Sequence, residues 1–487
     1  MSKNSKISSS FLWKLLERFG VQGIQFVLQM VLARLLSADH YGVMALMFIF
    51  INLANVFIQK GFNTALIQNK DVTEEDYSSV FWVSLGITVV LYGMIYFAAP
   101  AIAAFYRMPD VVAPLRVLSL SLFPGVVNSI QLAKVSREMD FKKVFYSNVI
   151  GILLAGIVGI GVALMGGGLW ALVIQNLLNI TTASAVMLFT VNWFPKLVCN
   201  LQRIAELFSF GWKLLVAGLL NMLEESLDSL VIGKKYTSSV LGYYNRGMQF
   251  PQFFIYAISG AMESVLLPSM SSQQDDRMQV KELTRNSILL GSYALFPMMA
   301  GLACVASPLI RLLLTDKWLP AVPYMQIWCF CFSFYSIFIS NLQAINSVGR
   351  SDWFLKLEIV KKIYSIALLM VAVVFFDTPM AIAMMGAVTA GLDWYVNSFP
   401  NKKLIGYPFW EQVADLLPVL LLTSVMCVAV MLVGYGCKVA SLPDIVTLIL
   451  QVLTGVGSYV LLSIVVKPYP YRMVMKLAED VWMKGKS

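Results

Sequence analysis

The sequence predicts an all-α integral membrane protein with about 14 transmembrane helices in two related halves. Hydrophobic residues make up 59% of the 487 residues and charged residues only 13%, with a mean hydropathy of +0.74. Soluble domains carry far more charge. Apolar runs of about 20 residues follow one another nearly end to end, which indicates helical spans rather than barrel strands. Polar residues also recur inside two of these runs at a constant spacing.

The expected spans are apolar segments separated by short connections, without an extramembrane domain. They lie at approximately 11–35, 41–61, 79–104, 111–133, 144–166, 168–191, 208–232, 239–266, 286–313, 321–345, 356–376, 379–399, 411–434 and 443–466. The first ten residues are polar and the first span carries Lys14 and Arg18, which does not match a cleavable signal peptide.

The distribution of Lys and Arg predicts the orientation. With a cytoplasmic N-terminus and 14 alternating spans, the cytoplasmic side holds 24 of the 36 basic residues and the opposite side nine. Both termini are therefore expected in the cytoplasm. The formal charge of +9 then reflects topology and attraction to the membrane surface, and no nucleic-acid partner is expected.

An internal repeat relates the first span to the seventh. The tetrapeptide Trp13–Leu16 returns as Trp212–Leu215, an offset of 199 residues, and Tyr41–Gly42 is matched by Leu241–Gly242. Six spans per half make the halves parallel repeats, as in carriers built from two bundles. We expect a six-helix lobe at 1–195, a second at 196–405, and two further helices with a cytoplasmic tail at 406–487.

The first polar stripe lies on span one. At about 100° per residue, five polar side chains fall within an arc of roughly 80°; they are Lys14, Arg18, Gln22, Gln25 and Gln29. The cations could bind a diphosphate and the amides sugar hydroxyls. The alternative is polar contact between helices, with Lys14 and Arg18 extending to the membrane surface.

The second polar stripe lies on span seven. Lys213, Asn221, Glu224 and Asp228 lie 199 positions after Lys14, Gln22, Gln25 and Gln29, and Glu225 is adjacent. Two carboxylates one turn apart within a membrane do not both ionise without a cation, so one would bind a proton or Na⁺. We therefore assign Glu224, Asp228 and Glu225 as candidates for ion coupling. An internal ion pair with a neighbouring span is the alternative.

Other candidates are fewer. Tyr243 and Arg246 open span eight and could bind sugar or phosphate, or could simply form an interfacial aromatic belt with an extended arginine. The single histidine, His40, is predicted to lie in a loop and has no second imidazole for a metal. The usual groups for acid–base or metal catalysis are missing, so we predict neither catalytic residues nor a metal or cofactor.

Several motifs resemble the Wzx-type polysaccharide flippases of the MATE-like (multidrug/oligosaccharidyl-lipid/polysaccharide) superfamily, including colanic acid and teichuronic acid exporters. The resemblance covers nearly the whole chain. It rests on residues 13–16 through 34–37 with Tyr41–Gly42, on 62–68, on 137–141 and on 241–246.

The resemblance implies two six-helix lobes with two outer helices, which flip undecaprenyl-diphosphate-linked oligosaccharides across the bacterial cytoplasmic membrane by alternating access. It also implies that Lys14, Arg18, Lys213 and Arg246 bind the diphosphate. The implied partners are the lipid-linked oligosaccharide, membrane lipids, and a polysaccharide polymerase and chain-length regulator.

Two other functions stay open at this point. A MATE-like multidrug or cation antiporter would favour an acidic, aromatic cavity, which the cations of span one oppose. A membrane-embedded polymerase or ligase would be expected to carry a large outer loop, and the expected outer connections are short.

Overall fold

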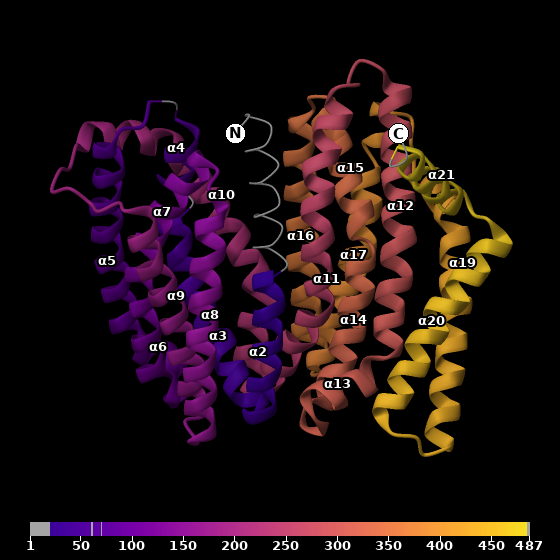
Figure 1. The fold of residues 1–487 in the computed structure, drawn as a ribbon, viewed down its shortest axis with the longest axis horizontal. Helices are drawn as coiled ribbons and strands as arrows, with labels where there is room; N and C mark the ends of the chain where they lie inside the picture. The colour runs from indigo at the N-terminus through magenta and orange to yellow at the C-terminus, as the bar shows by residue number, and fades with distance from the viewer. Residues whose placement is uncertain (1–19, 60–61, 70, 485–487) are drawn as a thin grey trace. The chain divides into compact units, whose positions relative to one another are not determined.

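The computed structural model describes residues 20–59, 62–69 and 71–484, and in this part of the chain it contains helices without any strand (Figure 1). The N-terminal helices are α2 (Gln22–Leu35), α3 (Ala38–Gln59), α4 (Phe62–Gln68), α5 (Glu74–Tyr106), α6 (Val112–Leu118), α7 (Leu122–Glu138), α8 (Phe141–Leu164), α9 (Leu169–Val191), α10 (Leu201–Lys235) and α11 (Ser238–Ser271). The C-terminal helices are α12 (Arg277–Cys304), α13 (Ala306–Leu314), α14 (Val322–Ser333), α15 (Tyr335–Ser347), α16 (Ser351–Phe375), α17 (Pro379–Ser398), α18 (Asn401–Leu404), α19 (Phe409–Val439), α20 (Asp444–Val466) and α21 (Tyr469–Lys484).

An all-α, multi-pass membrane fold is confirmed. Among the described residues, nine helical segments are long and apolar enough to cross a membrane. A tenth is obtained if the two parts of α10, bent by 55° between Ser209 and Gly211, count as one span. The described parts of all 14 predicted segments are largely helical, but this criterion does not confirm 14 spans.

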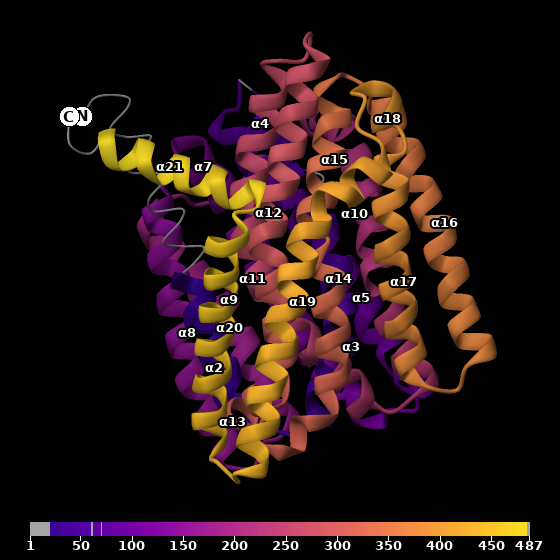
Figure 2. The same ribbon diagram turned by 90° about the vertical axis from the view of Figure 1, so that its right-hand side faces the viewer.

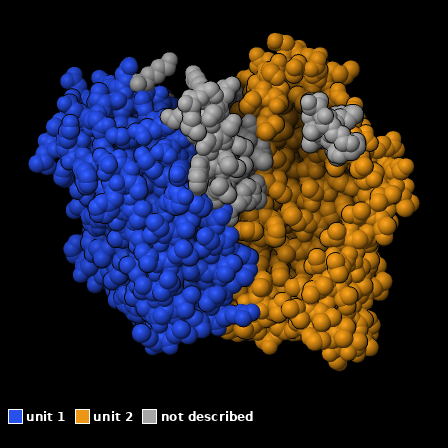
Figure 3. All heavy atoms as spheres, in the orientation of Figure 1, with its two compact units in different colours: residues 1–245 blue, residues 246–487 orange. Residues whose placement is uncertain are grey.

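The chain forms two compact units, residues 1–245 and 246–487, coloured separately in Figure 3. The division falls inside α11, so α10 and the first turns of α11 belong to unit 1. The division into lobes at 1–195, 196–405 and 406–487 stays a prediction.

Glycines allow close helix packing in unit 1. A Cβ on Gly151 would lie 2.9 Å from the carbonyl oxygen of Asn179, and one on Gly159 would lie 2.8 Å from the Cβ of Gln175. Both contacts join α8 to α9, whose backbones therefore approach closely, as small residues permit in membranes.

The first turn of α3 corrects one prediction. His40 lies in this turn and not in a loop, because the helix already begins at Ala38. Its ring Nδ1 lies 3.1 Å from the hydroxyl of Ser37, the residue just before the helix. Serine is a favoured residue at the start of a helix, and this contact fixes the imidazole there.

The connection between α9 and α10 is bound to the side of α5. The Trp82 indole donates a hydrogen bond to the Lys196 carbonyl at 2.8 Å, and the Lys196 amide donates to the Ser78 hydroxyl at 3.1 Å. The Asn200 amide donates to Ser79 at 3.0 Å. The backbone groups of Lys196 and Asn200 thus find partners on α5 although this segment has no regular secondary structure.

A proline inside α5 leaves a carbonyl without its helical partner. Pro100 has no N–H to donate to the carbonyl of Tyr96, four residues earlier. The Arg116 Nε donates to this carbonyl at 3.1 Å, and the guanidinium carbon lies 4.0 Å from the centre of the Tyr96 ring. Arg116 thereby supplies the donor that Pro100 lacks.

The same arrangement occurs in unit 2. Pro297 lies inside α12 and leaves the Tyr293 carbonyl without its helical donor. The hydroxyl of Tyr459 on α20 donates to this carbonyl at 2.9 Å, and the two tyrosine rings lie 5.2 Å apart. The proline of one helix is therefore compensated by a side chain of another, which holds α20 against α12.

Ion pairs hold α19 to α12. The Arg285 guanidinium donates two hydrogen bonds to the Asp415 carboxylate, at 2.7 and 2.6 Å, and the Tyr407 hydroxyl donates to the same carboxylate at 2.8 Å. Lys281 pairs with Glu411 at 2.8 Å. A bidentate arginine–carboxylate contact with low exposure of the acid is among the stronger polar contacts in proteins.

We predict that Tyr459→Phe lowers the stability of the purified protein by about 1 kcal/mol, because the Tyr293 carbonyl loses its donor while the ring packing stays. Thermal unfolding in detergent measures the effect. Tyr435→Phe is the matched control, since Tyr435 is 71% exposed on α19. Equal unfolding temperatures for the two variants would contradict this account of how the carbonyl freed by Pro297 is stabilised.

Candidate functional site

The described part of the first polar stripe lies on α2. Gln22 is exposed, and Gln25 and Gln29 are half-buried. The hydroxyl of Tyr41, on α3, donates to the Gln29 side-chain oxygen at 3.4 Å. Lys14 and Arg18 lie outside the described residues, so their predicted role is not placed in space.

The second polar stripe lies on α10. Lys213, Asn221 and Glu225 are exposed, while Glu224 and Asp228 are half-buried. The hydroxyl of Tyr244, on α11, donates to the Asp228 carboxylate at 3.0 Å. The residues of this stripe therefore differ in environment, and the hydrogen bond from Tyr244 is at its C-terminal end.

The two stripes end in the same kind of contact. Gln29 and Asp228 occupy equivalent positions of the repeat, and each accepts a hydrogen bond from a tyrosine hydroxyl of the next helix. The tyrosines themselves, Tyr41 and Tyr244, are not at equivalent positions. The repeat therefore reproduces a chemical contact and not merely a residue type, although an amide in one half is replaced by a carboxylate in the other.

The start of α11 carries the remaining predicted residues. Tyr243 is half-buried, and Asn245 lies within hydrogen-bond distance of Ser229 on α10, at 3.4 Å. Arg246, the first residue of unit 2, is only 5% exposed; its guanidinium hydrogen-bonds Gln249 and lies 5.5 Å from the centre of the Trp318 ring. In this structure Arg246 is thus a packed interior residue, separate from the Asp228–Tyr244 contact.

Two glycines related by the repeat face each other in unit 1. A Cβ on Gly42 would lie 1.7 Å from the carbonyl oxygen of Ser238, and one on Gly242 would lie 2.0 Å from that of Ala38. The Ser238 hydroxyl also hydrogen-bonds the Asp39 carboxylate. The contact is reciprocal, as expected for a pseudo-two-fold relation, and it needs glycine on both sides.

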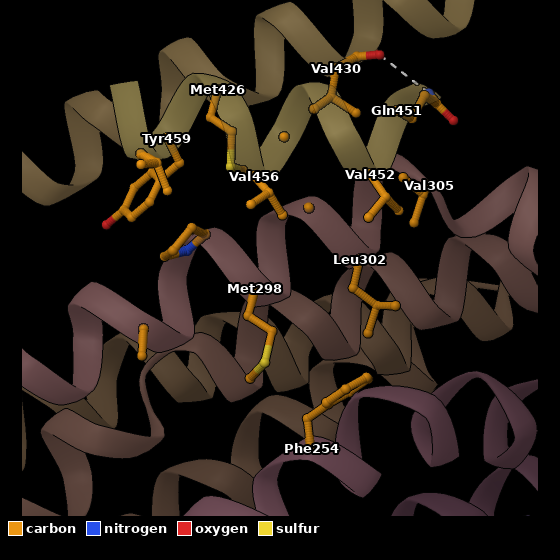
Figure 4. Close-up of a pocket in the computed structure, with 15 residues that line it drawn as sticks. Phe254, Met298, Leu302, Val305, Met426, Val430, Gln451, Val452, Val456 and Tyr459 are labelled. Carbon is orange, nitrogen blue, oxygen red and sulfur yellow. Dashed lines mark hydrogen bonds between the residues drawn. The ribbon is translucent and has the colours of Figure 1, made fainter. Parts of the chain in front are cut away.

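Unit 2 contains an apolar cavity of about 430 Å³ formed by α12, α19 and α20 with Phe254 of α11 (Figure 4). Met298 and Leu302 face Val456 and Tyr459 across it. Its chemistry suits a hydrocarbon chain and not a sugar or phosphate, because burial of unpaired polar groups is costly. The polar part of any ligand must therefore bind elsewhere.

The tyrosines that bind the stripes cannot be identified from the sequence. Tyr41 and Tyr244 become partners of Gln29 and Asp228 through the packing of consecutive helices. A further pair was missed on α16 and α17, where the hydroxyl of Tyr364 donates to Asp393. The sequence does show Asp393 as an acid within an apolar segment, but no sequence pattern links it to Tyr364. Within the described residues, no group of three or more His, Cys, Asp or Glu side chains is arranged to bind a metal.

Curated relatives come from bacterial polysaccharide pathways. The chain is 25% identical over 306 residues to the teichuronic acid biosynthesis protein TuaB of Bacillus subtilis (strain 168), which covers 61% of this chain and 62% of that protein. It is 25% identical over 316 residues to the succinoglycan biosynthesis transport protein ExoT of Rhizobium meliloti (strain 1021), covering 65% and 64%. It is 23% identical over 336 residues to the lipopolysaccharide biosynthesis protein WzxC of Escherichia coli (strain K12), covering 68% and 67%. The chain thus matches under two thirds of the length of the first two relatives.

Solved structures share the fold at low sequence identity. The lipid II flippase MurJ in its inward closed conformation superposes with a TM-score of 0.73 at 14% identity, covering 96% of this chain and 100% of that one. An inward-facing multidrug resistance MATE transporter of the MOP superfamily gives a TM-score of 0.61 at 14% identity, covering 80% and 98%. These likenesses establish the fold alone.

The family described as polysaccharide biosynthesis protein matches residues 31–323, which is more than half of the chain. That span includes the Gln29 partner Tyr41, the glycine pair and the whole second polar stripe. The predicted resemblance to polysaccharide flippases is confirmed, and the chain belongs to this polysaccharide biosynthesis protein family.

Proposed function

We propose that this protein is a secondary transporter that flips lipid-linked oligosaccharides across the bacterial cytoplasmic membrane. The observation that carries the proposal is the pair of polar stripes on α2 and α10, whose equivalent residues Gln29 and Asp228 both bind a tyrosine hydroxyl. Polar residues at repeated positions of membrane helices are expensive unless they line a hydrated path. Family membership and the flippase fold support the same assignment.

The substrate we propose is an undecaprenyl-diphosphate-linked repeat unit of a surface polysaccharide. Lys14, Arg18 and Lys213 supply cations for the diphosphate, and Gln22, Gln25, Gln29, Asn221 and Tyr243 supply hydrogen bonds to sugars. Arg246 could join the cations that bind the diphosphate only in a conformation in which its guanidinium leaves Trp318. The apolar cavity of unit 2 suits the hydrocarbon part of such a lipid.

Ion coupling is assigned to the carboxylates of α10. Glu224 and Asp228 are half-buried, and Asp228 already accepts one hydrogen bond from Tyr244. A carboxylate in such a place binds H⁺ or Na⁺ readily because the bound cation removes a buried charge. Glu225 is an exposed neighbour that can attract the cation. No resident cofactor is part of the proposal.

Alternating access requires a contact that closes and opens. The Gly42–Gly242 contact joins the starts of α3 and α11, which belong to the two predicted lobes. We propose that it closes one side of the pathway. With both termini in the cytoplasm this side is the outer one, and a polymerase and a chain-length regulator act on the substrate after its release there. No catalytic step is assigned to the protein itself.

We predict that removing the charges of Lys14 and Lys213 together, by substitution with Gln, lowers the translocation rate roughly tenfold or more, as expected when charge-assisted hydrogen bonds are lost. The assay uses proteoliposomes containing a fluorescent undecaprenyl-diphosphate oligosaccharide, with a glycosidase added outside to detect newly exposed sugar. Arginine at both positions should keep most of the rate. Lys402→Gln, an exposed position in α18, is the matched control. Unchanged rates in the double variant would refute the assignment of Lys14 and Lys213 to the diphosphate. Elongation of the glycan without exposure of its sugar to the external glycosidase would favour a polymerase.

We predict that Asp228→Asn abolishes the stimulation of translocation by an imposed H⁺ or Na⁺ gradient while leaving slow, gradient-independent exposure of sugar. The amide keeps the hydrogen bond to Tyr244 but cannot bind a cation by charge. Asp275→Asn, an exposed acid between α11 and α12, serves as the control. If the Asp228→Asn variant still responds to either gradient as the unmodified protein does, coupling through this carboxylate is excluded.

We predict that Gly42→Ala or Gly242→Ala reduces closure at the contact between α3 and α11. Each Cβ would lie 2.0 Å or less from a backbone carbonyl oxygen, so the two helix starts must separate. The readout is disulfide formation between cysteines placed at Asp39 and Ser238 in a variant without native cysteines. Gly86→Ala is the control, since no heavy atom lies within 4 Å of its added Cβ. Equal cross-linking yields in all variants would reject the gate.

A further inference from the structure

The C-terminal helix α21 leaves the last membrane span at a sharp turn. Only Lys467 and Pro468 separate it from α20, and Lys467 has a left-handed backbone with φ of 48°. Pro468 cannot continue a helix, so the chain changes direction here. Figure 2 shows α21 crossing the end of α20 and running away from the neighbouring helices. A helix placed this way starts at the level where the span ends.

The sequence of α21 divides into two faces. At about 100° per residue, most of the apolar residues fall within an arc of about 160°, and the charged residues lie on the opposite side together with Met473 and Met483. The apolar arc holds Tyr471, Val474, Met475, Leu477, Ala478, Val481 and Trp482, and the polar arc holds Arg472, Lys476, Glu479, Asp480 and Lys484. This is the pattern of helices that lie in the plane of a membrane surface.

One end of α21 is fixed to the bundle. The Tyr469 hydroxyl lies 3.4 Å from the Asn286 side-chain oxygen of α12, and the Arg285 guanidinium lies 5.7 Å from the centre of the Tyr469 ring. Pro470 is buried. The first turn therefore has a protein partner, which sets where the helix begins and in which plane it can extend.

Further along, the apolar arc is open. Val474 and Met475 are each 42% exposed although both lie on that arc. The end of α20, just before this helix, is also apolar and exposed, with Val465 at 79% and Val466 at 51%. Exposed apolar residues therefore occur on both sides of the turn between α20 and α21.

Charge favours one kind of membrane surface. From residue 467 to the end the sequence has five Lys or Arg and two acidic residues. Lys467, Arg472 and Lys476 are all exposed. Basic residues beside a membrane helix attract anionic lipid headgroups.

We propose that α21 is an interfacial helix that binds the anionic headgroup surface of the membrane at the end of α20, with Val474 and Met475 in the boundary of the acyl chains and its basic residues at the phosphates. The proposal does not depend on flipping activity; the proposed orientation only decides that the surface is that of the inner leaflet.

The test uses the full-length protein with its six native cysteines replaced and one spin label at Val474→Cys, Met475→Cys, Arg472→Cys or Lys476→Cys. One copy per nanodisc is reconstituted in phosphatidylcholine, with or without a third of phosphatidylglycerol. Collisions with O₂, which concentrates in lipid, are compared with collisions with a water-soluble nickel chelate. Val428→Cys, 57% exposed within α19 and inside the expected span 411–434, is the lipid-facing reference.

We expect labels at 474 and 475 to favour O₂, labels at 472 and 476 to favour the nickel chelate, and phosphatidylglycerol to increase this contrast. Equal access of the nickel chelate to all four labels in both bilayers would overturn the proposal. Shielding of 474 and 475 from both reagents would assign the face to protein instead. If shielding occurs only in discs with two copies, the partner is a second chain. Each variant is first checked for a single elution peak, and two labels per face guard against a variant that fails to fold.

Discussion

The constraint on which this structure depends is that a polar group inside a membrane must find its partner within the protein. Two helices with an internal proline show how it is met. Pro100 and Pro297 each leave a backbone carbonyl without its helical donor, and Arg116 and Tyr459 donate from other helices. Each proline therefore requires a specific neighbour, so the two helices that meet there cannot move independently. In unit 2 this coupling ties α20, which the sequence alone places as an outer addition, to the middle of α12.

The same constraint gives meaning to the polar stripes. Gln29 and Asp228 occupy equivalent positions and both accept a tyrosine hydroxyl, so the contact persists although its acceptor differs in charge. Packing alone would be served equally well by two amides. The carboxylate adds the free-energy cost of placing an ionisable group inside the membrane, which an amide at the same position would avoid. An ionisable residue in a membrane helix is typically functional. The contrast between a cationic and amide-rich first stripe and an acidic second stripe therefore argues for a division of labour between substrate and coupling ion.

Much of the secondary structure could be predicted because the residues that end each helix are close to it in the sequence. The predicted segment 379–399 corresponds to Pro379–Ser398 and 443–466 to Asp444–Val466, since proline and polar residues end the apolar runs. The internal repeat could also be recognised from the sequence. In the structure its glycines, Gly42 and Gly242, each lie directly against the backbone of the other helix. The partners of the stripes could not be predicted, because Tyr41 and Tyr244 meet them through the packing of successive helices. Arg246 shows the same limit: its aromatic neighbour Trp318 lies 72 positions later in the chain, and no local pattern links the two.

Charge balance connects these features to transport. In the proposed function, a diphosphate bound by Lys14, Arg18 and Lys213 would exchange water for cations, which is favourable only while the partners remain matched. A substrate that leaves on the other side must be released from the same cations, so tight binding alone would stop the cycle. Protonation or Na⁺ binding at Asp228 changes the local charge by one unit without moving the hydrogen bond from Tyr244. Asp228 lies on the same helix as Lys213, so its change of charge can weaken or restore the positive electrostatic potential at the proposed substrate site. Such a change is the physical requirement for coupling an ion gradient to the movement of an anionic lipid.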